Sequence, residues 1–212
     1  MRDDTTSFGS GAISPDHHRI VLTGVPRGGE DLLRLAVDVN RGAAARKQIS
    51  WSGGITGVHF YDNDRAICEG DESRVEVAFS ATADPVFTVL PKGPDEDCIV
   101  GMFQGKPVYQ PRAAYYGEGV ERDSLVWDGH RVDFEPWVDR ILPGTSTMWV
   151  LAGTGEVFAI DNRATKKLVG RRPDEVIIGS GLAGDILCIA GEDGRISFYG
   201  VPNPPSLRIH LP

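Results

Sequence analysis

The chain has 212 residues, a formal net charge of −8 and an apolar fraction of 41%, which is ordinary for a globular domain. The acidic balance disfavours general nucleic-acid binding, and no apolar run approaches the roughly 18–20 residues that span a membrane. The sequence contains 26 glycines and 14 prolines, and no long window keeps a period of 3.6 residues. Many short strands are therefore favoured over helices.

The first strands are expected at Phe8–Ser14 and Arg19–Gly24. The next segment, Asp31–Val39, is ambiguous, because its apolar residues would also form a helical stripe. Its sequence LAVDVNRGAAARKQI is similar to VFAIDNRATKKLV further along the chain, with the aspartates at the same place. The comparison favours a strand that ends near Val39, then a polar turn and a fourth strand at Gln48–Trp51.

Further strands follow in groups of four. The second group comprises Ile55–Tyr61, Ala66–Cys68, Val75–Ser80 and Val86–Leu90. A third group begins with Cys98–Phe103 and Pro107–Gln110, but its order fails in Arg112–Asp123 and Val126–Pro136. The fourth group comprises Val138–Leu142, Met148–Ala152, Glu156–Asp161 and Lys167–Gly170. The fifth group begins at Val176–Gly181 and ends at Leu207–Leu211.

Two hairpins of one pattern stand out near the end of the chain. In Asp185–Val201 an apolar run is followed by Glu192-Asp193-Gly194 and a second apolar run. An Asp-Gly pair between apolar runs is a strong hairpin signal. Met148–Asp161 repeats the pattern with Gly153-Thr154-Gly155 as its turn. With a strand before and after each hairpin, the pattern gives four antiparallel strands per unit, as in a propeller blade.

These hairpins resemble the repeats of WD40-like and quinoprotein-like β-propellers. IAGEDGRISFYGV is similar to the second strand, turn and third strand of a WD40 repeat, with Tyr199-Gly200 in place of Trp-Asp. The dipeptide Trp127-Asp128 is followed at once by Gly129-His130, which is more typical of a hairpin turn. The resemblance covers about the last 65 residues and implies a fold but no activity.

We therefore predict an all-β chain that forms a β-propeller of about five four-stranded antiparallel blades in a single domain. The blades are expected at residues 7–52, 55–91, 97–136, 137–171 and 175–212. Such repeats usually have this length. A β-sandwich and a part of a larger propeller are the alternatives.

Neither a catalytic motif nor a cofactor site is expected. The GxSxG, GxxxxGK[ST], HExxH and EF-hand patterns are absent. Of the five histidines, His59 alternates with apolar residues on a strand and is expected to be a hydrogen-bonded core or channel residue. Cys68, Cys98 and Cys188 lie far apart in apolar runs, which indicates buried free thiols and no metal. Together with a start that lacks a secretory pattern, the thiols predict an intracellular, cytoplasmic protein.

Alternate turns of a meander lie at opposite ends of its strands. Once the strands are grouped into blades, acidic turn residues gather at one end and basic turn residues at the other. One end is expected to be acidic, with Glu69, Asp71, Glu72, Asp95, Glu96, Asp97, Asp174, Glu175, Glu192 and Asp193. The other is expected to be basic, with His17, His18, Arg19, Arg41, Arg46, Lys47, Arg65, Arg163, Lys166 and Lys167. The plainer interpretation is that turns are polar in any protein.

The leading hypothesis for function is a non-catalytic protein-interaction scaffold, whose acidic rim binds a basic segment of a protein partner. The alternative is a small-molecule-binding or enzymatic propeller with a ligand in its axial funnel, near His59 and Tyr109–Glu118. A third hypothesis has the basic rim contact nucleic acid or anionic lipid. Association of two chains into a homo-oligomer is a further expectation.

Overall fold

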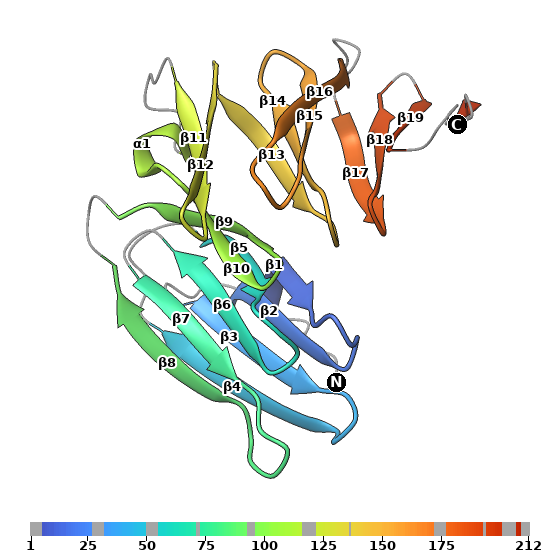
Figure 1. Ribbon diagram of the computed structural model, residues 1–212. Helices are drawn as coiled ribbons and strands as arrows, with labels where there is room; N and C mark the ends of the chain where they lie inside the picture. Colours follow the sequence, from blue (N-terminus) through green and yellow to red (C-terminus); the bar gives the residue numbers. More distant parts are fainter. Residues whose placement is uncertain are drawn as a thin grey trace. The chain divides into compact units, whose positions relative to one another are not determined.

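The computed structural model describes residues 6–26, 32–49, 55–70, 73–92, 96–115, 122–135, 137–171, 177–192, 194–200 and 207–208. The chain divides into two compact units, residues 1–105 and 106–212, and each is described by itself. Figure 1 labels their strands. No helix in the described part is long and apolar enough to cross a membrane.

The strands form five four-stranded antiparallel sheets, each with its strands in sequence order. The first unit contains β1 (Thr6–Ile13), β2 (Arg19–Pro26), β3 (Leu32–Asp38), β4 (Ala43–Ile49), β5 (Ile55–Phe60), β6 (Arg65–Gly70), β7 (Ser73–Ala78), β8 (Val86–Pro91) and β9 (Cys98–Phe103). The second contains β10 (Lys106–Gln110), α1 (Arg112–Tyr115), β11 (Asp123–Trp127), β12 (His130–Phe134), β13 (Val138–Pro143), β14 (Met148–Ala152), β15 (Glu156–Ile160), β16 (Lys166–Arg171), β17 (Ile177–Ala183), β18 (Ile186–Gly191), β19 (Arg195–Tyr199) and β20 (Leu207–Arg208). The all-β prediction is confirmed.

Apolar side chains from neighbouring sheets form the cores. In the first unit, Val21 and Ala36 of the first sheet pack with Val58, Val75 and other buried residues of the second. The first strands β1 and β5 lie beside each other, as do β5 and β9. In the second unit, Trp149 and Leu151 of the fourth sheet pack with Leu187 and Ile189 of the fifth. The first sheet therefore buries a face against the second, and the fourth sheet buries a face against the fifth.

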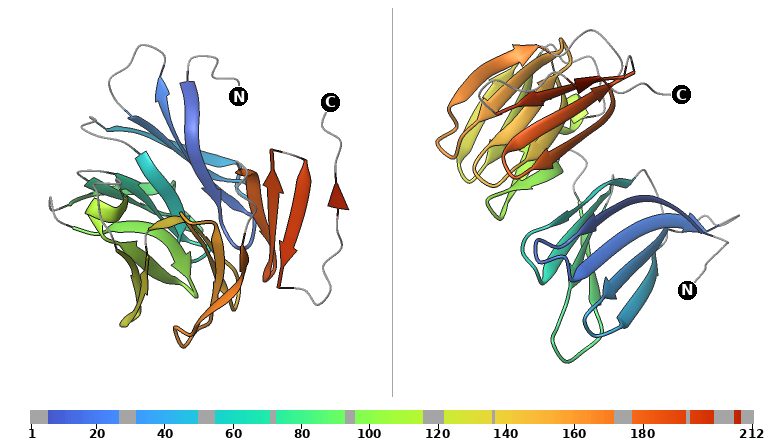
Figure 2. Two further views of the ribbon diagram at one scale, coloured as in Figure 1. Left: turned by 90° about the horizontal axis from the view of Figure 1, so that it is seen from above. Right: turned by 90° about the vertical axis from the view of Figure 1, so that its right-hand side faces the viewer.

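A β-bulge recurs at one place in four of the sheets. Between the first and second strands the register shifts at Phe8/Ser10, Ile55/Gly57, Val138/Arg140 and Ile177/Gly179. The second strand places a small residue opposite the start of each shift: Gly24, Gly70, Ala152 and Gly191. Because a bulge increases local twist, the same feature bends each first strand in the same region. The long strands β1 and β2 are visibly curved in Figure 2.

The turn predictions near the repeated hairpins are confirmed. Gly155 and Gly194 have φ values of 88° and 76°, and each donates a backbone hydrogen bond to the residue three positions earlier, at 2.9 and 3.0 Å. Asp128 and Gly129 form the hairpin turn between β11 and β12, with φ values of 44° and 79°. The Trp-Asp dipeptide at this place is therefore part of a tight turn and not a repeat signature.

Two local predictions need correction. Residues Asp31–Val39 contribute the strand β3 as expected, but the fourth strand, predicted at Gln48–Trp51, begins earlier and comprises Ala43–Ile49. Ser50 and Trp51 lie outside the described residues. This fourth strand forms one edge of the first sheet, where Arg46 and Lys47 are exposed, so it lacks the apolar alternation on which the prediction depended. The irregular stretch after β10 begins with a single helical turn, α1, and its strands are β11 and β12. That all five sheets form one domain stays a prediction.

Asp185 joins the last two sheets and provides a test of this packing. Its Oδ1 accepts hydrogen bonds from the backbone N–H groups of Ser146 and Thr147 at 2.9 and 3.2 Å, and its Oδ2 accepts one from Ser146 Oγ at 2.6 Å. We expect Asp185→Ala to lower the free energy of unfolding by about 1–3 kcal/mol, because the two N–H groups lose their acceptor. Urea denaturation measures the change. Asp84→Ala, in an exposed turn, is the control, and equal losses in both variants would contradict the prediction.

Candidate functional site

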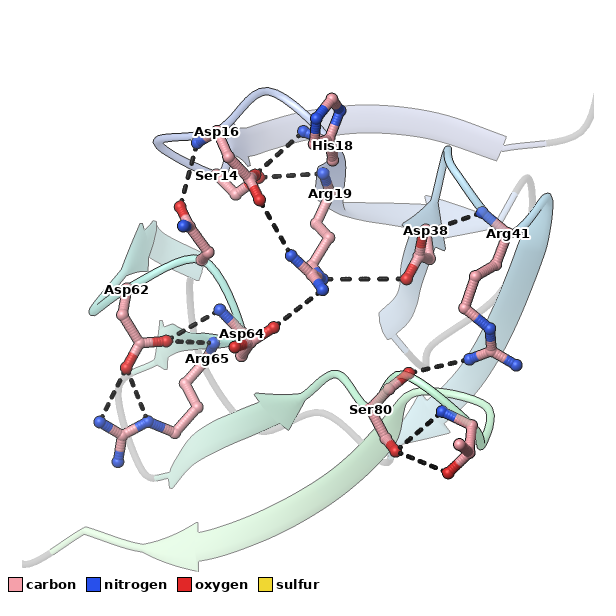
Figure 3. A network of polar contacts seen from close by, with 12 residues as sticks. Ser14, Asp16, His18, Arg19, Asp38, Arg41, Asp62, Asp64, Arg65 and Ser80 are labelled. Carbon is pink, nitrogen blue, oxygen red and sulfur yellow. Dashed lines mark hydrogen bonds and ion pairs between the residues drawn. The ribbon is translucent and has the colours of Figure 1, made fainter.

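One end of the first unit gathers the β1–β2, β3–β4, β5–β6 and β7–β8 turns around Arg19 (Figure 3). The Arg19 guanidinium contacts Asp16 at 3.1 Å, Asp64 at 2.8 Å and Asp38 at 3.8 Å. It also lies over the ring of Phe79, 5.7 Å from the centroid. The Arg19 side chain is only 16% exposed, so its contact with the buried Asp38 lies away from water, whereas Asp64 is exposed. Arg19 thus ties three turns from two sheets to the apolar core.

The aspartates of this end also organise their own turns. Asp16 Oδ1 accepts hydrogen bonds from Ser14 Oγ at 2.5 Å and from the His18 N–H at 3.1 Å. These contacts, with Ser14 first, lower the pKa of Asp16. Asp62 accepts from the N–H groups of Asp64 and Arg65 in the same way, and it forms an ion pair with the Arg65 guanidinium at 2.9 Å. Carboxylates of this type favour tight turns because they replace backbone acceptors.

Arg41 joins the first sheet to the second on the same end. Its guanidinium donates hydrogen bonds to the backbone carbonyls of Ser80 at 2.9 Å and Ala83 at 2.5 Å. The backbone N–H of Arg41 donates to Asp38 Oδ1 at 3.1 Å. Asp38 closes the β3–β4 turn as Asp161 closes the β15–β16 turn, where Asp161 Oδ1 accepts from Arg163 and Thr165. The sequence match between these two aspartates is thereby confirmed in geometry.

The prediction of a basic rim is wrong for the first unit. The cations Arg19 and Arg65 are paired with aspartates of the same end, and Arg41 binds backbone carbonyls. Arg46 and Lys47 lie within the strand β4 and not in a turn. His17 and His18 are exposed turn residues, as expected. In the second unit Arg163 lies in the β15–β16 turn, and Lys166 and Lys167 begin the strand β16. The prediction counted Arg19 and Arg65 without the aspartates that pair with them.

The opposite end of the first unit contains a buried ion-pair cluster. Glu69 and Lys92 side chains are fully buried and bonded to each other, and Arg74 Nε contacts Glu69 at 2.7 Å. Lys92 Nζ also lies 3.3 Å from Cys98 Sγ. The prediction that Glu69 contributes to an exposed acidic rim is wrong, since both of its oxygens are used inside the protein. Cys68 and Cys98 are buried and not joined in a disulfide, as predicted, whereas Cys188 is half-buried.

Arg74 extends this cluster to the surface. Its NH1 group pairs with Glu96, and its NH2 group donates to the backbone carbonyl of Asp97 at 2.6 Å. The start of β7 therefore contacts the segment directly before β9. Glu69, Glu96 and Asp97 are the predicted acidic residues that the structure brings together. Glu192 is exposed in the β18–β19 turn. The remaining predicted residues lie outside the described residues: Asp71, Glu72, Asp95, Asp174, Glu175 and Asp193.

His59 lies on β5 with its Nε2 atom buried. Burial, the larger effect, lowers the pKa of His59 from 6.5 to about 4, although a hydrogen bond to the Ile99 backbone acts in the opposite direction. Its Nε2 has no hydrogen-bond partner in the described part of the chain. A methyl group on Gly57 would lie 2.6 Å from this atom, which explains the glycine. His59 is thus a neutral, hydrogen-bonded residue of the interior.

A polar groove of about 560 Å³ lies in the second unit. Its lining residues are Pro111, Arg122, Asp123, Ser124, Arg131, Asp133, Phe134, Glu135, Phe158 and Lys166. Sequence reasoning missed this groove, although it pointed to the neighbouring segment Tyr109–Glu118. Among residues whose positions the structure gives, no three His, Cys, Asp or Glu side chains are placed to hold a metal ion.

The five four-stranded meanders define the class of protein, which is a β-propeller with one sheet per blade. Solved structures bear out this fold. A prolyl endopeptidase matches 100% of the chain with a TM-score of 0.65 and 14% identity, and the chain spans 36% of its length. The β-propeller domain of Cps50 (Swd1) from Myceliophteria thermophila matches 95% of the chain, and 72% of its own length is covered, with a TM-score of 0.60 and 9% identity.

A chain of the mitotic checkpoint complex matches 94% of this chain and is itself covered over 78%, with a TM-score of 0.56 and 9% identity. These neighbours confirm the resemblance to WD40 and other propellers at the level of the fold. No family model matches the sequence. A comparison with curated proteins also finds no match.

The buried ion pair predicts a large asymmetry between variants. Lys92→Met leaves Glu69 Oε1 buried without its cation, while Arg74 stays paired with Oε2, and should lower the free energy of unfolding by about 3–5 kcal/mol. The double variant Glu69→Gln, Lys92→Met should recover part of this loss, because the half-paired buried carboxylate is gone. Lys106→Met is the control: Lys106 lies 3.7 Å from Asp128 in an exposed pair, so its loss should cost less than about 1 kcal/mol. Chemical denaturation in which the double variant is no more stable than Lys92→Met would refute this account.

His59 predicts a loss of stability in mild acid. The folded chain binds this proton only near pH 4, whereas the unfolded chain binds it near pH 6.5. Between these values the unfolded state holds more protons, so the free energy of unfolding should fall by about 3 kcal/mol as the pH decreases. Urea denaturation from pH 7.5 to pH 4 measures the slope. His59→Gln should show a shallower slope in this window, and an unchanged slope would contradict the assignment.

Proposed function

We propose that the chain is a non-catalytic protein-interaction propeller that binds a basic segment of a partner protein through the acidic end of its first unit. The observation that carries the proposal is the contact of Arg74 with Glu69, Glu96 and the Asp97 backbone. This contact brings the start of β7 and the segment directly before β9, which are distant in sequence, together at this end. The described cysteines form no disulfide, which supports an intracellular protein.

The balance of charge at this end favours a cationic partner. Arg74 and Lys92 pair with the carboxylates of Glu69 and Glu96, and the sequence adds Asp71, Glu72, Asp95 and Asp97 at this end. At the opposite end, five aspartates stand against Arg19, Arg41 and Arg65: Asp16, Asp38, Asp62, Asp64 and Asp84. The acidic end has six carboxylates against two cations, and this larger excess of negative charge would attract and orient a basic segment.

Charge reversal on the acidic connection tests the proposal. Asp95→Lys, Asp97→Lys should weaken the binding of a synthetic arginine-rich octapeptide by about 10-fold or more, because two attractive charges become repulsive. Glu96 is left unchanged, so that Arg74 keeps its partner. Isothermal titration calorimetry at two salt concentrations measures the affinity, which should fall with salt.

The matched control places the same change in net charge at the opposite end. Ala81→Lys, Thr82→Lys, Asp84→Lys alters the exposed β7–β8 turn and should change the affinity by less than about twofold. Melting temperatures of both variants should stay close to that of the unaltered chain. Equal losses of affinity in the two variants, or no binding by the unaltered chain, would refute an acidic-end site.

A further inference from the structure

The polar groove of the second unit has the size of a small-molecule site. Its volume of about 560 Å³ falls within the range of roughly 300–1,000 Å³ that is usual for such sites. The groove lies against β11 and β12 of the third sheet and against Phe158 and Lys166 of the fourth. Phe158 lies on β15 and Lys166 on β16, so all four strands are the third or fourth of their sheets. The axial funnel considered in the sequence analysis would lie at the first strands, so the groove is distinct from it.

Ser124 points to a ligand because its hydroxyl group lacks a partner. The residue is 1% exposed, it lines the groove, and its Oγ makes no hydrogen bond in the described part of the chain. Its backbone is held by Asp123, whose Oδ1 accepts from the Ser124 N–H at 2.6 Å. The other oxygen of Asp123 accepts from Gln110 Nε2 at 2.6 Å and from the Val138 N–H at 2.8 Å. A buried hydroxyl group in such a fixed place is usually satisfied, and a ligand in the groove would satisfy it.

Two ion pairs border the groove on the same face of the β11–β12 ribbon. Ser124 is paired in register with Asp133, so the alternate residues Arg131 and Glu135 share its face. Arg131 contacts Asp133 through Nε at 2.8 Å, and Arg122 contacts Glu135 through Nε at 3.0 Å. The terminal nitrogens of both guanidinium groups make no contact with the described residues, and neither do the second carboxylate oxygens. The border therefore offers donors and acceptors side by side.

Lys166 lines one side of the groove and forms no ion pair there. Its Nζ donates to the backbone carbonyl of Asp133 at 2.5 Å and lies over the rings of Phe134 and Phe158, 4.7 and 5.3 Å from their centroids. The two rings are themselves in an edge-to-face contact at 5.7 Å. Phe158 and Pro111 provide apolar surface for the uncharged part of a ligand.

We propose that this groove binds a zwitterionic small molecule of the size of a di- or tripeptide. A ligand carboxylate would bind the guanidinium groups of Arg122 and Arg131, and a ligand ammonium group would bind Asp133 and Glu135. Ser124 donates to or accepts from the ligand at the closed side of the groove. A simple anion is disfavoured by the two carboxylates, and a simple cation by the two guanidinium groups. The inference is independent of the acidic end of the first unit.

Calorimetric titration of the full chain with trialanine tests the proposal. Trialanine should bind saturably, whereas N-acetylated and C-amidated trialanine should each bind at least about 5-fold more weakly, because each lacks one charge. Ser124→Ala should weaken trialanine binding by about 5-fold or more while the melting temperature stays equal or rises, since the variant removes a buried hydroxyl group without a partner. A purely structural serine would not separate these two readouts.

Arg131→Gln provides a second variant, and Arg140→Gln is its charge-matched control. Arg140 lies on β13 and donates to Ser180 Oγ at 2.9 Å, away from the groove. Arg131→Gln should lower the affinity by about 10-fold, and Arg140→Gln should leave it within about twofold. Absence of saturable binding, equal binding of the blocked peptides, or unchanged affinity in both Ser124→Ala and Arg131→Gln would overturn the proposal.

Discussion

Every junction between consecutive sheets depends on a charged side chain whose hydrogen bonds cross from one sheet to the next. Arg19 joins the first two sheets, Arg74 reaches the start of the third, Asp123 accepts from the first strand of the fourth, and Asp185 binds the fourth from the fifth. Apolar packing between sheets is strong but not directional. These polar contacts have fixed donors and acceptors, so they fix where one sheet packs against its neighbour.

The same contacts decide which charges face water. Glu69 is consumed by Lys92 and Arg74 in the interior, and Arg19 neutralises aspartates that would otherwise make one end strongly acidic. The charges that remain exposed are those that this internal pairing does not use. Both functional proposals start from them, one from carboxylates in excess at a surface and the other from ion pairs with unused atoms. Structure and recognition thus draw on one set of side chains.

The fold could be predicted because its signals are local. Asp-Gly and Gly-x-Gly turns between short apolar runs place the hairpins, and the match of Asp38 with Asp161 identifies a strand where a helix was also consistent. The edge strand β4 was placed too late because one of its sides faces water and needs no apolar pattern. Glu69 was misread because its burial depends on Lys92, which is 23 residues away. The groove could not be foreseen, since an unpartnered Ser124 hydroxyl exists only when two sheets are in place.

The recurring bulge determines which side chains of the first strand face inward. An additional residue in a strand reverses which of the following side chains faces inward. At Asp139 the additional residue therefore shifts the inward-facing positions by one relative to a two-residue alternation. Removing that one amino acid would leave a regular alternation with the same side chains facing inward, and it would remove the local twist that the bulge adds. The first strand of a blade is thus marked by a break in its alternation of inward-facing and outward-facing residues.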